Sequence, residues 1–228
     1  MAEVGAVLVH GLWHGGWAWD GVRARLDAAG VPSAAVELPL TGFEDDVAAT
    51  LAALDRFARP AVLVGHSYGG AVVTAAGEHP HVTHLLYLAA FMLAEGESVS
   101  RALPDLDIPP TGLGDALRFS ADGQQVSVDP ALATGVFYAD APADAAAAEV
   151  ARLRPVHRSV FRGVPATIGW RRTPSTYVVC ADDQAVHPDL QRAMAERATA
   201  RLEWPGSHSP ALTRPGDVAT RIAELAAR

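Results

Sequence analysis

The chain has 228 residues, of which 50% are hydrophobic and 19% charged, a balance typical of a globular protein with room for one sizeable α/β domain. Its formal net charge of −8 disfavours nucleic acid and anionic membrane surfaces as partners. The single cysteine, Cys180, excludes an intrachain disulfide, and its apolar neighbours predict a buried, unreactive thiol.

No apolar run reaches the ~18 residues that are needed to cross a bilayer, so no membrane-spanning helix is predicted. The first apolar run begins soon after Met1, without a basic leader segment or a cleavage site. We therefore expect a cytoplasmic protein. Its oligomeric state stays open, with a homodimer as one option.

Six apolar runs recur along the chain, and several are rich in Val and Leu. Their nearly continuous apolar character is typical of parallel strands that are covered on both faces. The predicted strands are Ala6–His10, Ala34–Leu38, Ala61–His66, Leu85–Ala90, Thr176–Cys180 and Leu202–Trp204.

Segments with helical periodicity separate these strands. This alternation predicts a doubly wound, mostly parallel six-stranded sheet with helices on both faces. The predicted helices are Trp19–Ala29, Asp45–Ala58, Ala71–Glu78, Leu190–Ala198 and Asp217–Ala227.

The alternation stops between about residues 94 and 174, where prolines are frequent and only Ala141–Leu153 has a clear helical pattern. An excursion of this length from a strand end is more typical of an inserted cap than of a disordered loop. We therefore predict a core formed by residues 1–93 and 175–228, with residues 94–174 as a mainly helical cap.

The most informative motif is G-x-S-x-G around Ser67, which follows the third predicted strand and precedes a helix of small residues. This context is the pattern of a nucleophile elbow, in which a strained turn exposes the serine hydroxyl. Gly65 and Gly69 suit such a turn because it leaves no room for β-carbons. The helix N-terminus behind the serine directs N–H groups at the reacting oxygen. Ser67 is the predicted nucleophile.

A serine nucleophile needs a base, and the base needs an orienting carboxylate. In a sheet of this type both follow the serine in loops after late strands, with the acid before the histidine. His208 comes after the last predicted strand and is the predicted base. Asp183 is favoured as the acid because it lies deeper in the loop after the fifth strand than Asp182, which remains an alternative, with Glu95 a distant third.

The oxyanion hole is expected to use two backbone N–H groups, that of Tyr68 after the nucleophile and that of Leu12 in the loop after the first strand. His10 and His14 are four residues apart, but they lie on a turn without an intervening glutamate, which disfavours a zinc site. No metal and no cofactor is predicted.

Aromatic residues are expected near the mouth of this site. Trp13 and Phe91 lie in the loops that follow two of the strands, and the predicted cap supplies Phe137 and Trp170. Core packing and a substrate wall both fit such residues, and we predict these four as substrate contacts.

Four segments resemble the α/β-hydrolase superfamily, and more narrowly the group of plant esterases and hydroxynitrile lyases with its bacterial relatives. They match that group's first strand and oxyanion loop, its elbow, its acid loop and its histidine loop, in that order along the chain. The matching segments are Val7–Trp17, Gly65–Gly70, Tyr177–Asp183 with Pro188, and Ser207–Pro210 with Arg214 and Pro215.

The resemblance implies that the second acidic position, Asp183, is the catalytic one. Members that cleave cyanohydrins carry a threonine after the first-strand histidine and a lysine directly after the catalytic histidine. Here these positions are Gly11 and Ser209, so the resemblance implies the hydrolase branch, which acts on small, largely apolar esters without cofactor or metal.

Together these features lead us to expect a carboxylesterase-type serine hydrolase that cleaves a small, largely apolar carboxylic ester through an acyl-enzyme intermediate. One alternative is a lyase or an acyl-transferring cyclase on the same scaffold. Another is a ligand receptor or binding protein with little turnover.

Overall fold

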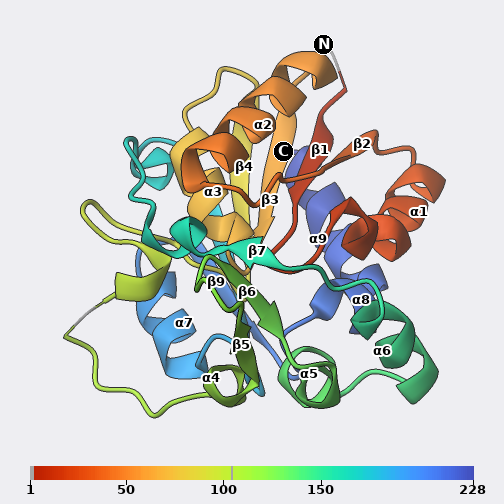
Figure 1. The fold of residues 1–228 in the computed structure, drawn as a ribbon. Coiled ribbons are helices and arrows are strands. Elements are labelled where there is room, and N and C mark those ends of the chain that lie inside the picture. The colour runs from red at the N-terminus through yellow and green to blue at the C-terminus, as the bar shows by residue number, and fades with distance from the viewer. Residues whose placement is uncertain (1–2, 104) are drawn as a thin grey trace.

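The computed structural model describes residues 3–103 and 105–228, and its main sheet has the strand order β2-β1-β3-β4-β8-β9 (Figure 1). Every neighbouring pair in this sheet is parallel, which confirms the predicted parallel six-stranded arrangement. The strands are β1 (Gly5–Val9), β2 (Ser33–Val36), β3 (Ala61–His66), β4 (Val82–Leu88), β8 (Ser175–Cys180) and β9 (Ala200–Trp204).

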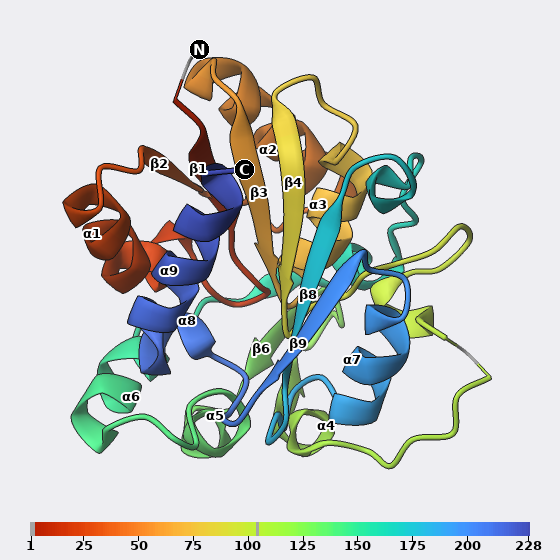
Figure 2. The ribbon, with the colours of Figure 1, turned by 180° about the vertical axis from the view of Figure 1, so that it is seen from behind.

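Helices cover both faces of the sheet, with α2 and α3 on one side and α1 and α9 on the other (Figures 1 and 2). Alternate side chains of β1 explain why its sequence is apolar throughout. Val7 and Val9 pack in the same core as helices α2 and α3, whereas Ala6 and Leu8 pack in the core of α1 and α9. The helices outside residues 94–174 are α1 (Asp20–Ala28), α2 (Phe43–Phe57), α3 (Gly69–Ala76), α7 (Pro188–Ala195), α8 (Pro210–Thr213) and α9 (Pro215–Ala226).

Between β4 and β8 the chain forms short helices and a second, three-stranded antiparallel sheet of order β5-β6-β7. These segments gather at the carboxyl end of the main sheet (Figures 1 and 2). They are α4 (Gly112–Ala116), β5 (Leu117–Phe119), β6 (Gln125–Val128), α5 (Pro130–Phe137), α6 (Ala143–Val150) and β7 (Val156–His157). Short 3-10 helices lie at Gly16–Trp19, Val99–Arg101, Arg158–Arg162 and Gly169–Arg171.

The sequence predicts α6 in this region but does not predict the small sheet or the helices α4 and α5. Strands of two to four residues offer too few positions for a period to be recognised. The start of helix α5 does have a sequence signal, an aspartate followed by a proline. Pro130 is the first residue of the helix, and the Asp129 carboxylate caps it by accepting a hydrogen bond from the N–H of Ala131 at 2.9 Å. Within the described residues, no helix combines the length and the apolar character that crossing a membrane requires.

Candidate active site

Ser67 lies in the turn between β3 and α3 with a φ of 55°, in the left-handed region that residues with a β-carbon rarely adopt. Hydrogen bonds on both sides hold this conformation. The N–H of Ser67 donates to the carbonyl of Leu88 at 3.2 Å, and the N–H of Phe91 donates to the carbonyl of Ser67 at 3.0 Å. The strained turn is therefore fixed by the end of the neighbouring strand β4.

The glycines around Ser67 allow strand and helix to approach closely. A β-carbon on Gly65 would lie 2.6 Å from the carbonyl oxygen of Gly69, and one on Gly69 would lie 2.5 Å from that of Val9. A β-carbon on Gly70 would lie 2.7 Å from the β-carbon of Ala90. The expectation that the turn leaves no room beside Gly65 and Gly69 is confirmed.

The structure brings His208 and Asp183 together below the surface, with 2.7 Å between Nδ1 and Oδ2. Three further donors hold the carboxylate. The N–H groups of Ala185 and Val186 donate to Oδ1 at 2.7 and 2.9 Å, and Nε2 of Gln191 donates to Oδ2 at 2.7 Å. Because a carboxylate accepts from Nδ1, the free nitrogen of His208 is Nε2. Gln191 was missed because no motif marks a residue one helical turn into α7.

The other two acid candidates lie elsewhere. Asp182 is exposed, and its Oδ2 accepts a hydrogen bond from the N–H of Gly206 at 2.9 Å, which ties the acid loop to the histidine loop. Glu95 is exposed and pairs with Arg171 at 3.3 Å. Neither therefore competes with Asp183 for His208.

His66, the variable residue of the elbow, contacts the histidine loop directly. Its Nε2 lies 2.7 Å from the carbonyl oxygen of His208, and the two ring centroids are 4.6 Å apart. Because a carbonyl oxygen only accepts, Nε2 of His66 carries the proton. Burial holds the pKa of His66 well below its ordinary value, so the ring is neutral.

Ser67 and His208 line the same cavity of about 40 Å³. Within residues 3–103 and 105–228 no hydrogen bond links the two side chains. Hydrogen bonds between a nucleophile and its base are commonly long without substrate and shorten only when substrate binds. The remaining wall is apolar apart from Tyr68 and consists of Leu12, Trp13, Tyr68, Phe91, Val99, Leu113, Phe137, Phe161, Ala185 and Val186.

Three of the four predicted substrate contacts, Trp13, Phe91 and Phe137, line this cavity. Trp170 does not line it, which contradicts the prediction from the sequence. It lies in the 3-10 helix that precedes the amino end of β8, whereas the cavity lies at the carboxyl ends of the strands. Its indole N–H donates to the carbonyl of Leu93 at 2.8 Å, a packing contact beside the core.

Leu12 and Tyr68, the predicted oxyanion donors, both line the cavity. In the described part of the chain neither backbone N–H has an acceptor. The Tyr68 side chain points into the core, where its hydroxyl donates to Oδ2 of the buried Asp46 at 2.6 Å. Burial raises the pKa of Asp46 to about 6.

In both His10 and His14, the two ring nitrogens already contact protein atoms. In His14, Nδ1 lies 2.7 Å from the carbonyl oxygen of Leu12 and Nε2 lies 2.6 Å from the hydroxyl of Tyr138. In His10, Nδ1 contacts Gly11 and Nε2 contacts Leu38. Burial lowers the pKa of His10 to about 3 and that of His14 to about 4. Neither ring is turned toward a shared metal position.

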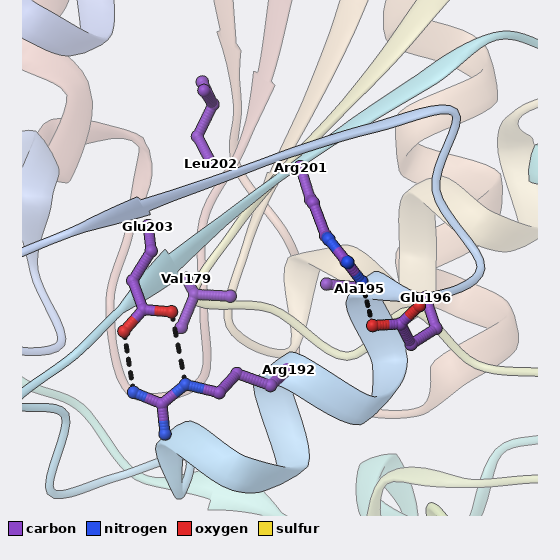
Figure 3. Close-up of a pocket in the computed structure, with 7 residues that line it drawn as sticks. All are labelled: Val179, Arg192, Ala195, Glu196, Arg201, Leu202 and Glu203. Carbon is purple, nitrogen blue, oxygen red and sulfur yellow. Dashed lines mark hydrogen bonds and ion pairs between the residues drawn. The ribbon is translucent and has the colours of Figure 1, made fainter.

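A larger hollow of about 440 Å³ lies between α7 and the edge strand β9, and it contains neither Ser67 nor His208 (Figure 3). Its charged side chains pair with one another. Two nitrogens of the Arg192 guanidinium contact the Glu203 carboxylate, and Arg201 pairs with Glu196. Charged side chains along an exposed edge strand oppose pairing with another sheet, which gives these charges a structural role.

Comparison with known proteins supports what the geometry indicates. An alpha/beta hydrolase nvfD from Aspergillus novofumigatus is 27% identical, with 100% of this chain and 98% of that protein covered. The pFDCC methylesterase from Arabidopsis thaliana is 27% identical, with 88% of this chain and 82% of that protein covered.

Solved structures share the fold. A pyrethroid hydrolase from Sphingobium faniae JZ-2 superposes with a TM-score of 0.80 at 22% identity, covering 98% of each chain. Polyneuridine aldehyde esterase superposes with a TM-score of 0.82 at 18% identity, covering 98% of this chain and 99% of its own.

The alpha/beta hydrolase from Aspergillus novofumigatus and the Arabidopsis thaliana methylesterase support a hydrolase or esterase activity for this chain. The sequence profile of the Alpha/beta hydrolase family matches residues 6–221, which is nearly the whole chain. The protein is thus a member of the alpha/beta hydrolase family.

Proposed function

We propose that this chain is a serine hydrolase that cleaves a small, largely apolar carboxylic ester through an acyl-enzyme intermediate. The observation that carries the proposal is the buried His208–Asp183 pair, with 2.7 Å between Nδ1 and Oδ2, beside the strained Ser67 in one cavity. A histidine that is oriented by a carboxylate and shares a cavity with a serine hydroxyl is the arrangement that nucleophilic acyl transfer needs.

In the acylation step, Ser67 Oγ attacks the ester carbonyl carbon while Nε2 of His208 takes its proton. Asp183 holds the imidazole in the required tautomer and stabilises the imidazolium that forms. The N–H groups of Leu12 and Tyr68 donate to the developing oxyanion, each contributing about 3 kcal/mol to lowering the barrier. The intermediate then collapses, the bond to the alcohol oxygen breaks, and His208 gives its proton to the departing alcohol.

Deacylation repeats the sequence with water as the nucleophile. His208 takes a proton from the water as its oxygen attacks the acyl carbonyl carbon, and the same two N–H groups meet the oxyanion. The intermediate then collapses, the bond between the acyl carbon and Ser67 Oγ breaks, and His208 gives its proton to Oγ as the carboxylic acid is released.

The dimensions of the cavity favour a small substrate. A volume of about 40 Å³ holds only a few heavy atoms, and its wall of aliphatic and aromatic side chains suits an apolar group. A short acyl chain fits this space, whereas a long one requires the wall to move.

Two positions favour hydrolysis over cyanohydrin cleavage. A β-carbon on Gly11 would lie 2.9 Å from Cβ of Ser67, so glycine leaves space beside the nucleophile that a threonine would fill. Ser209, directly after His208, has an uncharged side chain and offers no ammonium to stabilise a departing cyanide.

A panel of esters graded by acyl and alcohol size tests the proposal, with Ser67→Ala as the blank. We expect kcat/KM to be highest for short acyl chains and to fall to background in the blank. Cyanide release from mandelonitrile at a rate comparable to ester cleavage would instead favour a lyase. Tight ligand binding without ester turnover would favour a receptor.

A further inference from the structure

His10 directly follows β1 and is completely buried. Its two ring nitrogens contact two different backbone groups. Nε2 lies 3.1 Å from the backbone nitrogen of Leu38, and Nδ1 lies 2.8 Å from the carbonyl oxygen of Gly11.

These two contacts allow only one form of the ring. A backbone N–H can only donate, so Nε2 accepts from Leu38 and carries no proton. The proton of the neutral imidazole is then on Nδ1, which donates to the carbonyl of Gly11. Burial lowers the pKa of His10 to about 3, so the ring stays neutral wherever an esterase with a histidine base is active.

The carbonyl of Gly11 belongs to the same peptide group as the N–H of Leu12. In a planar trans peptide the oxygen and the hydrogen point in opposite directions, so holding the oxygen toward the His10 ring directs the N–H away from it. Accepting a hydrogen bond at the oxygen also polarises the amide and strengthens its N–H as a donor.

Ser67 lies close to the Gly11 end of this peptide. A β-carbon on Gly11 would lie 2.9 Å from Cβ of Ser67 and 3.3 Å from its Oγ. Leu12 lines the cavity that contains Ser67, and its N–H has no acceptor in the part of the chain that the structure describes.

We propose that His10 is a positioning residue, which acts through the Gly11 carbonyl to orient and polarise the Leu12 N–H for the oxyanion. The inference rests on the proposed esterase function. His10 does not touch the substrate and transfers no proton; it aligns one donor of the oxyanion hole.

Two substitutions separate the contacts of the ring. His10→Asn places an amide nitrogen near the position of Nδ1, so it keeps the donor to Gly11 and loses the acceptor for Leu38. His10→Gln places an amide oxygen near the position of Nε2, so it keeps the acceptor for Leu38 and loses the donor to Gly11. Each variant gives up one hydrogen bond in the same buried place, which makes them matched controls.

With p-nitrophenyl acetate, we expect kcat of His10→Gln to fall about tenfold or more with little change in KM, because alignment of one oxyanion donor is lost. His10→Asn should rescue kcat to within about threefold of the unmodified protein. Binding of trifluoroacetone, which forms a hemiketal oxyanion on the serine, should weaken in His10→Gln by a factor similar to the loss in kcat. The apparent pKa in the pH profile of kcat/KM should not move in either variant.

Equal losses of kcat in the two variants, or losses that follow Tm, would overturn the proposal. Nitrogen-15 NMR of the histidine rings in the unmodified protein tests it without any substitution, since the proton must be on Nδ1 of His10. The opposite tautomer would also overturn it. If Ser67→Ala retains ester hydrolysis, the proposed function itself fails; if only the two His10 variants are equal, the inference alone fails.

Discussion

Four hydrogen bonds converge on the Asp183 carboxylate, and one of them comes from His208. In Asp183→Asn an amide replaces the acceptor that fixes the histidine tautomer, so we expect kcat for ester hydrolysis to fall on the order of 10⁴-fold. Steady-state kinetics with p-nitrophenyl acetate measures this loss.

Asp182→Asn is the matched control, because an asparagine oxygen also accepts from the N–H of Gly206. We expect it to keep kcat within a few-fold. If Asp182→Asn loses as much activity as Asp183→Asn, the assignment of the acid is wrong.

The buried Asp46 carboxyl predicts a pH dependence of stability. Burial raises its pKa in the folded protein to about 6, so its contribution to the free energy of unfolding is present below its ordinary pKa of ~4 and is lost as the pH rises through about 6. Relative to Asp46→Asn, the unmodified protein should therefore lose stability across this window, by at most ~1.4 kcal/mol per pH unit.

Urea unfolding measures the difference in the free energy of unfolding between the two proteins. It is followed at several pH values between about 4 and 7, a range that includes the ordinary and the raised pKa of Asp46. Asp45→Asn removes an exposed carboxylate that is only a minor cause of the raised pKa of Asp46, so it should keep most of the slope of the unmodified protein. A constant difference between Asp46→Asn and the unmodified protein would show that Asp46 does not titrate in this range.

Much of the site at this scale could be predicted from sequence. Ser67, Asp183 and His208 each follow a strand of the parallel sheet, and the carboxyl ends of such strands meet at one edge. The supporting residue Gln191 could not be predicted, since its contact with Asp183 depends on how α7 packs. Trp170 was misassigned because composition does not tell which end of the sheet an aromatic side chain reaches.

At the scale of elements, two helical glycines should respond oppositely to substitution by alanine. A β-carbon on Gly69 would meet the carbonyl oxygen of Val9 at 2.5 Å, whereas one on Gly135 in α5 has no atom within 4 Å. Gly69→Ala should destabilise the protein by about 1–3 kcal/mol through overpacking and displace Ser67. Gly135→Ala should stabilise it by about 0.5–1 kcal/mol, because alanine favours the helix.

Thermal unfolding and ester turnover of the two variants check this pair. Unchanged activity and Tm in Gly69→Ala would mean that the elbow is less tightly closed than the contact distances indicate.

The predicted elements of the main sheet were correct where a long apolar run or a clear helical period existed. Strands β1, β3 and β8 are buried along their whole length, so their sequences are rich in apolar residues and lack a strict apolar–polar alternation. The sequence does not predict β5, β6 and β7 because each strand is too short for an alternation of apolar and polar residues to be recognised. In addition, β5 is largely exposed.

At the scale of the whole molecule, residues between β4 and β8 close the cavity over Ser67, contributing Val99, Leu113, Phe137 and Phe161. We propose that residues 94–174 act as a cap that sets the size of the substrate. The division between core and cap remains a prediction from the sequence, whereas the location of these four side chains follows from the structure.

Phe161→Ala tests the role of this wall, because removing the ring enlarges a cavity of only about 40 Å³. We expect the ratio of kcat/KM for p-nitrophenyl hexanoate to that for the acetate to rise about tenfold. Phe119→Ala is the matched control, since Phe119 is 65% exposed and does not line this cavity. An equal shift in both variants would contradict a direct effect on the cavity.

The central claim is that Ser67 forms a covalent acyl intermediate. The most direct test is mass spectrometry of the protein after rapid acid quenching of its reaction with p-nitrophenyl acetate. We predict one acetyl group on the peptide that contains Ser67, formed in a burst with the release of p-nitrophenol and absent in Ser67→Ala. Steady ester turnover with Ser67 unmodified, or full turnover by Ser67→Ala, would contradict the account.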